Sequence, residues 1–294
     1  ISLCWRFGLY NAQSPRPAKR RKVVPELPEV EVTRLGLKPL LKSKVGKVVI
    51  RNYSLRWPIS SKLPELLKNQ TLLDLSRRGK YILAKFVSGT LIIHLGMSGR
   101  LCIVSSGDQL NKHDHVDIQF KDNNLILRYR DPRRFGSILW TEEDPYNHKL
   151  IKNLGPEPLN TEFDAKYLFA ILKNKKQCIK NAIMDSHVVV GVGNIYASEA
   201  LHDSGIRPNR ISKKVSMKEV VSLVESIKKI IKEAIKKGGS TMNDFFDVNG
   251  DNGYFQNEHK VYGREGLPCF QCHHPIIQLR LGQRSSFFCK KCQR

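Results

Sequence analysis

Three carboxylates and two prolines lie close together within Val24–Glu31, directly after a run of basic residues. Pro28 followed by two acids is typical of a helix start, because proline suits the first helical position and the helix dipole favours acids in the first turn. This explanation leaves Pro25 and Glu26 without a role. The motifs downstream indicate that these two residues carry chemistry.

Four cysteines near the C-terminus have the spacing Cys269-x2-Cys272-x16-Cys289-x2-Cys292. Each C-x-x-C pair bends the chain so that two thiolates face one point, and two pairs complete a tetrahedron around Zn²⁺. Four protein ligands predict one structural zinc ion, which would supply much of the folding free energy of so short a segment. His273 and His274 are alternative ligands, although surface positions at a hairpin tip explain them better. A redox dithiol is a weaker alternative.

The residues between the two cysteine pairs are basic and polar. They include Arg280, Gln283, Arg284 and Ser285. Such residues at the tip of a metal-bound hairpin suit phosphate contact. A solvated turn explains them equally well from the sequence alone.

The charge balance points to a polyanionic partner. The 294 residues include 50 Lys and Arg against 27 Asp and Glu, a formal net charge of +23. Nucleic acid is favoured over an anionic membrane surface, and the excess is more than solubility requires. No apolar run approaches the roughly 18 residues of a membrane span. Seven scattered cysteines and the absence of a recognisable secretory signal favour a reducing compartment.

Residues 1–24 contain six basic residues, no acid and no clear periodicity, which predicts a disordered segment. Lys19–Lys22 is a possible nuclear-import patch. A solvated tail, or translation of sequence upstream of the true start, explains it better. The chain begins with Ile1 and its first methionine is Met97. We therefore expect residues 1–23 to be a gene-model artefact, with translation starting at Val24 and the initiator methionine removed before Pro25.

The order of periodic segments predicts an α+β fold. A helix over 28–41 precedes eight short strands, which predict a β-sandwich or barrel. The strands are expected at 45–50, 72–75, 81–86, 90–95, 101–104, 116–120, 125–129 and 137–140. A boundary is expected at Gly155–Pro158, followed by helices over 163–173, 178–185, 194–203 and 216–237. The last of these has a capping box at Ser216 and Glu219.

Seven motifs occur in an order that closely resembles the bacterial formamidopyrimidine-DNA glycosylase family. They are Pro25–Glu31, Arg78–Tyr81, His94–Gly99, His113–Asp117, Asp131–Gly136, Gly191–Tyr196 and the four cysteines. The resemblance covers residues 25–294. It implies a catalytic β-sandwich domain over 25–155, a linker over 156–162, a helix-two-turn-helix domain over 163–260 and a zinc hairpin over 261–294. The implied activity is removal of oxidised purines, chiefly 8-oxoguanine, followed by strand cleavage.

The resemblance assigns catalytic roles to four residues. Pro25 would be the nucleophile, because a terminal α-amino group with a pKa of about 7.7–8.0 is partly neutral at working pH. Glu26 would be the general acid, with a pKa raised by a desolvated site. Lys80 and Arg284 would donate protons in β- and δ-elimination. Without the resemblance, Lys80 reads as an ordinary surface lysine.

The resemblance also assigns contacts to damaged DNA. Met97 and Phe135 would fill the gap left by a flipped base, and Arg133 would bind the orphaned partner base. Core packing is the alternative for both apolar residues, but their glycine, serine and arginine neighbours favour loop tips. The remaining contacts would be Glu29, near the sugar, together with His113, Lys175 and Asn194. We expect free N–H groups at Asn194 to receive a phosphate, and residues 250–253 to form a mobile loop over the base.

Three functional hypotheses follow. The first is a bifunctional glycosylase and lyase acting as a monomer on double-stranded DNA in the bacterial cytoplasm, with one structural zinc, no organic cofactor and no membrane partner. The second is a lesion-binding protein without lyase chemistry, because a proline nitrogen in an amide bond forms no Schiff base. The third is a zinc-ribbon nucleic-acid-binding protein without chemistry. It leaves the Pro25–Glu26 opening, Lys80 and Arg284 without a role.

Overall fold

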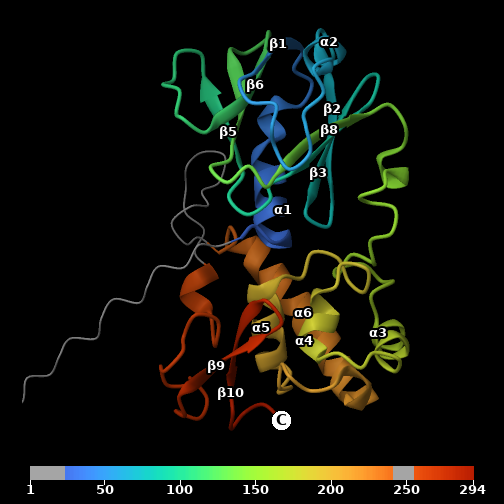
Figure 1. Ribbon diagram of the computed structural model, residues 1–294, viewed down its shortest axis with the longest axis vertical. Helices are drawn as coiled ribbons and strands as arrows, with labels where there is room; N and C mark the ends of the chain where they lie inside the picture. Colours follow the sequence, from blue (N-terminus) through green and yellow to red (C-terminus); the bar gives the residue numbers. More distant parts are fainter. Residues whose placement is uncertain (1–23, 241–254) are drawn as a thin grey trace, which may run out of the picture.

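The computed structural model describes residues 24–240 and 255–294, and these form two lobes stacked along the long axis of the molecule (Figure 1). The predictions for residues 1–23 and for the loop at 250–253 lie outside the described residues. The first lobe contains the two four-stranded sheets, and the second contains most of the helices and the C-terminal hairpin.

The first lobe is a sandwich of two antiparallel sheets with four strands each. One sheet has the order β1 (Val45–Ile50), β6 (Asp114–Phe120), β7 (Leu125–Arg130) and β5 (Arg100–Ser105). The other has the order β2 (Leu72–Arg78), β3 (Tyr81–Phe86), β4 (Thr90–His94) and β8 (Ser137–Thr141). Alternate apolar residues of both sheets share one buried core. The predicted eight-stranded sandwich is confirmed.

The main difference from the expected strands is the length of β2. The apolar stretch ended at Leu75, whereas the strand continues through Ser76 and Arg77 to Arg78, paired with β3 throughout. Both arginines are mostly buried and bind carboxylates, so polar residues extend the strand where apolar periodicity stops. The short helix α2 (Leu63–Leu67) was not predicted, because five residues are too few to show helical periodicity.

The second lobe packs four helices around an apolar core. They are α3 (Ala165–Leu172), α4 (Ile179–Met184), α5 (Asn194–Asp203) and α6 (Met217–Lys236), each within two residues of its predicted bounds. Short 3-10 turns lie at Lys38–Leu40, Pro145–Asn147, Ser212–Lys214 and Phe255–Glu258. The capping box of α6 is present at Ser216. Within 24–240 and 255–294, no helix is both long and apolar enough to cross a bilayer.

The C-terminal hairpin consists of β9 (Ile276–Leu281) and β10 (Arg284–Cys289), which pair antiparallel. It lies beside α5 in the second lobe (Figure 1). The hairpin and the helical lobe complete the expected α+β architecture.

Helix α1 (Leu27–Gly36) joins the two lobes because it contributes to both cores. Leu27 is completely buried in the core of the helical lobe, and its N–H donates to the Gly191 carbonyl at 3.2 Å. One turn further, Val30 is buried in the core of the sandwich, as is Leu37 beyond the helix end. The start of α1 is therefore fixed from both sides.

A buried group of charges connects the strands of the first sheet. Arg128 is 4% exposed and donates to both oxygens of Asp117 at 2.9 Å. Asp117 also pairs with Arg51 at 2.6 Å, and Asp114 binds Arg130. Burial alone raises the pKa of Asp117, but the hydrogen bonds and charges of Arg128 and Arg51 outweigh it and lower the pKa. The pairing therefore stabilises the ionised carboxylate.

We expect Arg128→Ala to lower the free energy of unfolding by about 3–5 kcal/mol at pH 7, because it leaves a buried carboxylate without its main partner. A carboxyl group with a lowered pKa stabilises the fold above its unfolded pKa of about 3.9 and loses this contribution as pH falls through the folded value. The difference between wild type and variant should therefore shrink below about pH 4. Urea denaturation across this pH range measures it.

Arg51→Ala is the matched control, because Arg51 binds the same carboxylate but its side chain is 29% exposed. Its cost should be clearly smaller. Equal costs for the two variants, or a difference that does not depend on pH, would contradict the assignment.

Candidate active site and nucleic-acid interface

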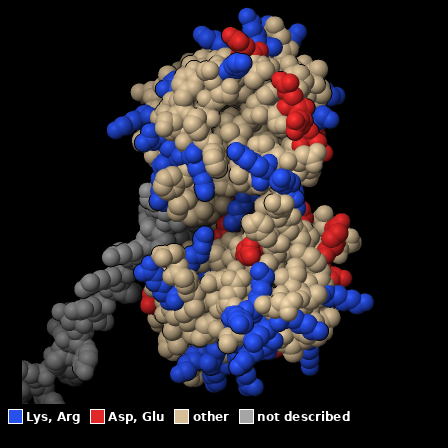
Figure 2. All heavy atoms as spheres, turned by 45° about the vertical axis from the view of Figure 1, so that its right-hand side comes forward, with Lys and Arg blue, Asp and Glu red and all other residues tan. Residues whose placement is uncertain are grey.

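A cavity of about 530 Å³ opens between the lobes. Its lining brings together residues from the segment just before α1, from the β2–β3 turn, from the loops after β4 and β7, from the start of α5 and from the hairpin. Seven predicted site residues line it: Pro25, Glu26, Lys80, Met97, Phe135, Asn194 and Arg284. Figure 2 shows the hollow between the lobes with lysine and arginine side chains on both sides of it.

Glu26 is 3% exposed and lies at the N-terminus of α5. Its carboxylate accepts hydrogen bonds from the N–H groups of Ile195 at 3.0 Å and Tyr196 at 3.4 Å. Burial raises the pKa of Glu26 above its usual range, although the charge of Lys80 and these N–H groups oppose the shift. A carboxyl group with a raised pKa holds a proton that it can donate.

The expectation that free N–H groups at the start of α5 receive a phosphate is wrong for Ile195 and Tyr196, because both donate to Glu26. The glycine before Asn194 explains how the carboxylate gets so close. A Cβ atom on Gly193 would lie 2.1 Å from the carboxyl carbon of Glu26. The Asn194 side chain lines the cavity, and its Oδ1 accepts a hydrogen bond from Lys180 at 2.7 Å.

Glu29 is completely buried below the cavity and is absent from its lining. One oxygen accepts from the Glu26 N–H at 2.9 Å, and the other accepts from the Tyr196 hydroxyl at 2.6 Å and the Ser240 N–H at 2.8 Å. Burial and the neighbouring Glu26 charge raise the pKa of Glu29 to about 6. These contacts fix the peptide that links Pro25 to Glu26.

Lys80 lines the cavity, and its surroundings suit a proton donor. Burial lowers the pKa of Lys80, with a further contribution from Arg284, while Glu26 opposes the shift. A lowered pKa means that this ammonium group gives up its proton more readily than a surface lysine does. The arrangement contradicts the alternative of an ordinary surface lysine.

Asp131 organises the loops that hold the predicted gap-filling residues. It is completely buried, and its carboxylate accepts from Ser98 Oγ at 2.6 Å, from the Gly136 N–H at 2.9 Å and from the Arg133 N–H at 3.2 Å. The first contact holds the loop of Met97, and the others hold the loop of Phe135. Phe135 is 43% exposed, so core packing does not explain it.

The other predicted DNA contacts lie outside the cavity lining. The guanidinium of Arg133 lies 4.9 Å from the centre of the Phe135 ring. His113 is half-buried, with its ring 6.4 Å from that of His115. Lys175 pairs with Asp185 at 3.4 Å. Arg133 therefore belongs to the same loop tip as Phe135, whereas His113 and Lys175 come from other segments, before β6 and after α3.

Sequence reasoning missed three basic residues in or beside the cavity. His94 and Arg56 line it, and Lys180 lies directly behind Asn194. Burial lowers the pKa of His94 to about 4 and that of Lys180 to about 7. His94 stands in the motif that contains Met97, so its neighbours gave a usable signal. Arg56 and Lys180 stand outside the recognised motifs, so no signal in the sequence pointed to them.

The four cysteines form one cluster, with their sulfur atoms within 4.8 Å of one another. The distance is 3.9 Å between Cys269 and Cys292, and 3.3 Å between Cys272 and Cys289. Tetrahedral zinc with Zn–S bonds of about 2.3 Å separates its sulfurs by about 3.8 Å, so the cluster fits a metal ion. His273 and His274 are exposed and stand outside the cluster.

The comparisons with known proteins agree with this fold and site. Residues 24–138 match the formamidopyrimidine-DNA glycosylase N-terminal domain, and residues 154–246 match the H2TH domain of the same enzymes. The formamidopyrimidine-DNA glycosylase of Methylobacillus flagellatus is 51% identical over 270 residues, which are 92% of this chain and 96% of that protein. That of Neisseria meningitidis is 48% identical over 276 residues, covering 92% and 100%.

Two solved structures extend the comparison. The MutM (Fpg) protein from Thermus thermophilus superposes with a TM-score of 0.82 at 34% identity, covering 92% of this chain and 98% of that one. The Lactococcus lactis Fpg bound to DNA containing an abasic site gives a TM-score of 0.85 at 31% identity, covering 92% and 100%. Fold, site and relatives define a DNA glycosylase. Within that class, the chain belongs to the formamidopyrimidine-DNA glycosylase family.

We expect Gly193→Ala to destabilise the protein by about 1–3 kcal/mol, because the added Cβ overlaps the Glu26 carboxyl group. Thermal melting measures the effect. In a Glu26→Ala background the same substitution should cost little, because the carboxyl group is gone. A cost that is the same in both backgrounds would show that the close approach of Gly193 and Glu26 is not the cause.

Proposed function

We propose that this protein excises oxidised purines, including 8-oxoguanine and formamidopyrimidines, from double-stranded DNA and then cleaves the strand at the resulting abasic site. The single observation that best supports this is the meeting of Pro25, Glu26, Lys80 and Arg284 around one cavity between two basic lobes. These residues supply a nucleophile, a general acid and two cations beside a polyanion. The division into domains at 25–155, 163–260 and 261–294 belongs to the same proposal.

The reaction begins at Pro25. Its free secondary amine attacks C1′ of the damaged nucleotide, and Glu26 donates the proton that assists opening of the sugar ring and departure of the base. The product is an iminium between Pro25 and C1′. The buried position of Glu26 supports this role, because a proton donor must still be protonated near neutral pH.

The iminium acidifies the C2′ proton, so the 3′ phosphate leaves by β-elimination and the 5′ phosphate by δ-elimination. Lys80 donates the proton in the first step and Arg284 acts in the second, where its guanidinium also binds phosphate. Glu29 acts near the sugar through the peptide of Glu26, to which it is hydrogen-bonded. No organic cofactor takes part in these steps.

The DNA contacts follow from the loop tips. Met97 and Phe135 fill the gap in the base stack, Arg133 binds the partner base, and His113, Lys175 and Asn194 contact the backbone. We propose that the protein acts as a monomer and that its place is the bacterial nucleoid, in the cytoplasm. Its relatives in Methylobacillus and Neisseria are bacterial proteins.

The metal in the cysteine cluster is proposed to be one Zn²⁺. Four thiolates in a tetrahedral arrangement favour zinc, and four protein ligands leave no position for substrate. The ion would hold β9 and β10 together at their base, so that Arg284 at the start of β10 projects toward the cavity. Its role is structural.

The reaction requires a free amine at Pro25, whereas in this chain Val24 precedes it. We propose that the active form begins at Pro25. The match to the family begins at residue 24, which supports this start. A chain that keeps residues 1–24 would bind damaged DNA without forming a Schiff base.

We expect protein that begins at Pro25 to become covalently linked to DNA containing 8-oxoguanine when borohydride is added, because borohydride reduces the iminium to a stable amine. The chain of residues 1–294 should give no linked product, because its proline nitrogen is an amide. Gel analysis of labelled DNA measures both.

Glu26→Gln in the protein that begins at Pro25 is the matched control. It should lose base excision by about 10²-fold or more while it still cleaves a preformed abasic site, because only base departure needs the carboxylic acid. Failure of the unsubstituted protein beginning at Pro25 to form a linked product would overturn the proposed chemistry.

Removal of the metal is expected to release one zinc ion per chain and to lower strand cleavage at least about tenfold, because Arg284 depends on the folded hairpin. Atomic absorption counts the ion, and added Zn²⁺ should restore cleavage. Full activity after complete removal of zinc would contradict a structural role for the ion.

A further inference from the structure

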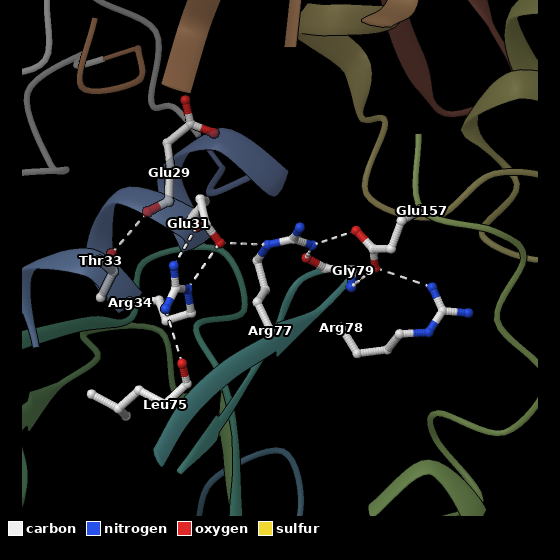
Figure 3. Close-up of polar contacts among 9 residues, drawn as sticks. All are labelled: Glu29, Glu31, Thr33, Arg34, Leu75, Arg77, Arg78, Gly79 and Glu157. Carbon is white, nitrogen blue, oxygen red and sulfur yellow. Dashed lines mark hydrogen bonds and ion pairs between the residues drawn. The ribbon is translucent and has the colours of Figure 1, made fainter. Parts of the chain in front are cut away.

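Glu157 binds the turn that carries Lys80, although it lies far away in the sequence. Its Oε1 accepts from the Gly79 N–H at 2.6 Å and from Arg78 at 3.0 Å, and its Oε2 accepts from Arg77 at 2.7 Å. Figure 3 shows the carboxylate between the two arginines and the turn. Glu157 stands in the connection between the lobes, after β8 and before α3.

Both the N–H and the carbonyl group of Gly79 make hydrogen bonds to charged side chains. Its N–H binds Glu157, and its carbonyl accepts from Arg77 at 2.9 Å. Gly79 has a φ of +58°, and a Cβ atom there would lie 2.2 Å from the Val190 side chain. The turn is therefore closely packed against the helical lobe, and its next residue is Lys80.

The charged cluster around Glu157 also contacts α1, the helix that follows Pro25 and Glu26. Arg77 Nε donates to Glu31 at 2.9 Å, and Glu31 also binds Arg34, which donates to the Leu75 carbonyl at 2.9 Å. Glu31 belongs to the helix that begins directly after Glu26. The cluster thus links the turn of Lys80 to the helix that follows Pro25 and Glu26.

A second arginine fixes the cluster to the connection between the lobes. Arg78 donates to the carbonyl groups of Leu154 at 2.7 Å and Gly155 at 2.6 Å. The charged side chains are mostly buried, at 14% exposed for Glu157, 12% for Arg77 and 15% for Arg78. Hydrogen bonds between charged groups shielded from water are stronger and more directional than those at an open surface.

We propose that Glu157 is a positioning residue for Lys80: it holds the β2–β3 turn so that the Lys80 ammonium group stays in reach of the elimination step. The inference rests on the proposed function, in which Lys80 donates that proton. Glu157 touches neither substrate nor the reacting atoms in this assignment. Its effect passes through the Gly79 peptide, and displacement of a reacting group by about 1 Å can cost about 10²-fold in rate.

A double-mutant cycle tests the proposal in protein that begins at Pro25. Single-turnover cleavage of a preformed abasic site is measured for the unsubstituted protein, Glu157→Ala, Lys80→Gln and the double variant. Rates are taken per active molecule, with the active fraction found by borohydride trapping. We expect Glu157→Ala to slow cleavage about tenfold or more but to change it less than about twofold in the Lys80→Gln background, because coupled residues are not additive.

Trapping separates positioning from a general structural role. Glu157→Ala should still form the Schiff base at Pro25, because the contacts of Glu26 and Glu29 are unchanged, so cleavage falls while trapping is kept. Glu157→Gln retains an acceptor for the Gly79 N–H and should recover part of the rate. Glu162→Ala, an exposed acid in the same connection, is the control and should behave as wild type.

Three outcomes would overturn the inference: a wild-type rate in Glu157→Ala, an equal factor lost in both backgrounds, or a parallel loss of trapping and cleavage. If Glu157→Ala does not fold, the cycle is run with Glu157→Gln, which keeps the shape of the side chain. A smaller loss of rate that disappears in the Lys80→Gln background then supports the inference, and an equal loss in both backgrounds overturns it. If the unsubstituted protein neither traps nor cleaves, the proposed function fails together with this inference. If the unsubstituted protein does both and only the Glu157 variants depart from expectation, the inference fails alone.

Discussion

The contact between the Glu26 carboxylate and the start of α5 is the interaction on which the rest of the site depends. It joins the residue after Pro25 to the helical lobe, through the N–H groups of Ile195 and Tyr196. Leu27 adds an apolar contact beside it, because its side chain is buried in the helical core. The two lobes therefore meet beside the candidate nucleophile.

The same contact controls the electrostatics of the cavity. The helix dipole and the Lys80 charge favour ionised Glu26, whereas burial favours the protonated acid and outweighs them. Glu29, with a pKa of about 6, is close enough to raise the cost of a second negative charge. Burial therefore raises the pKa of both acids beside Pro25, which is the direction that a general acid at this position requires.

Sequence reasoning predicted the elements well and the long-range contacts poorly. The eight strands and four helices follow from local periodicity and turn residues, so their positions were recovered to within a few residues. The cysteine cluster follows from spacing alone. The partners of Glu26 and Glu157 lie 169 and 78 residues away in the contacts with Ile195 and Gly79, and no local pattern encodes them. For this reason the start of α5 was expected to bind phosphate rather than a carboxylate of the protein itself.

These long-range contacts share one physical logic. Buried carboxylates hold the loops around the cavity by accepting backbone N–H groups: Glu26 holds α5, Asp131 holds Gly136, Glu157 holds Gly79, and Glu199 holds residues 260–262. The chain has only 27 acidic residues against 50 basic ones. Acids that bind backbone N–H groups in this way are no longer exposed at the surface. A polyanion is repelled by exposed acids, and an acid under a loop is both shielded and fully hydrogen-bonded. These four acids therefore fix the loops without placing a bare negative charge on the surface around the cavity.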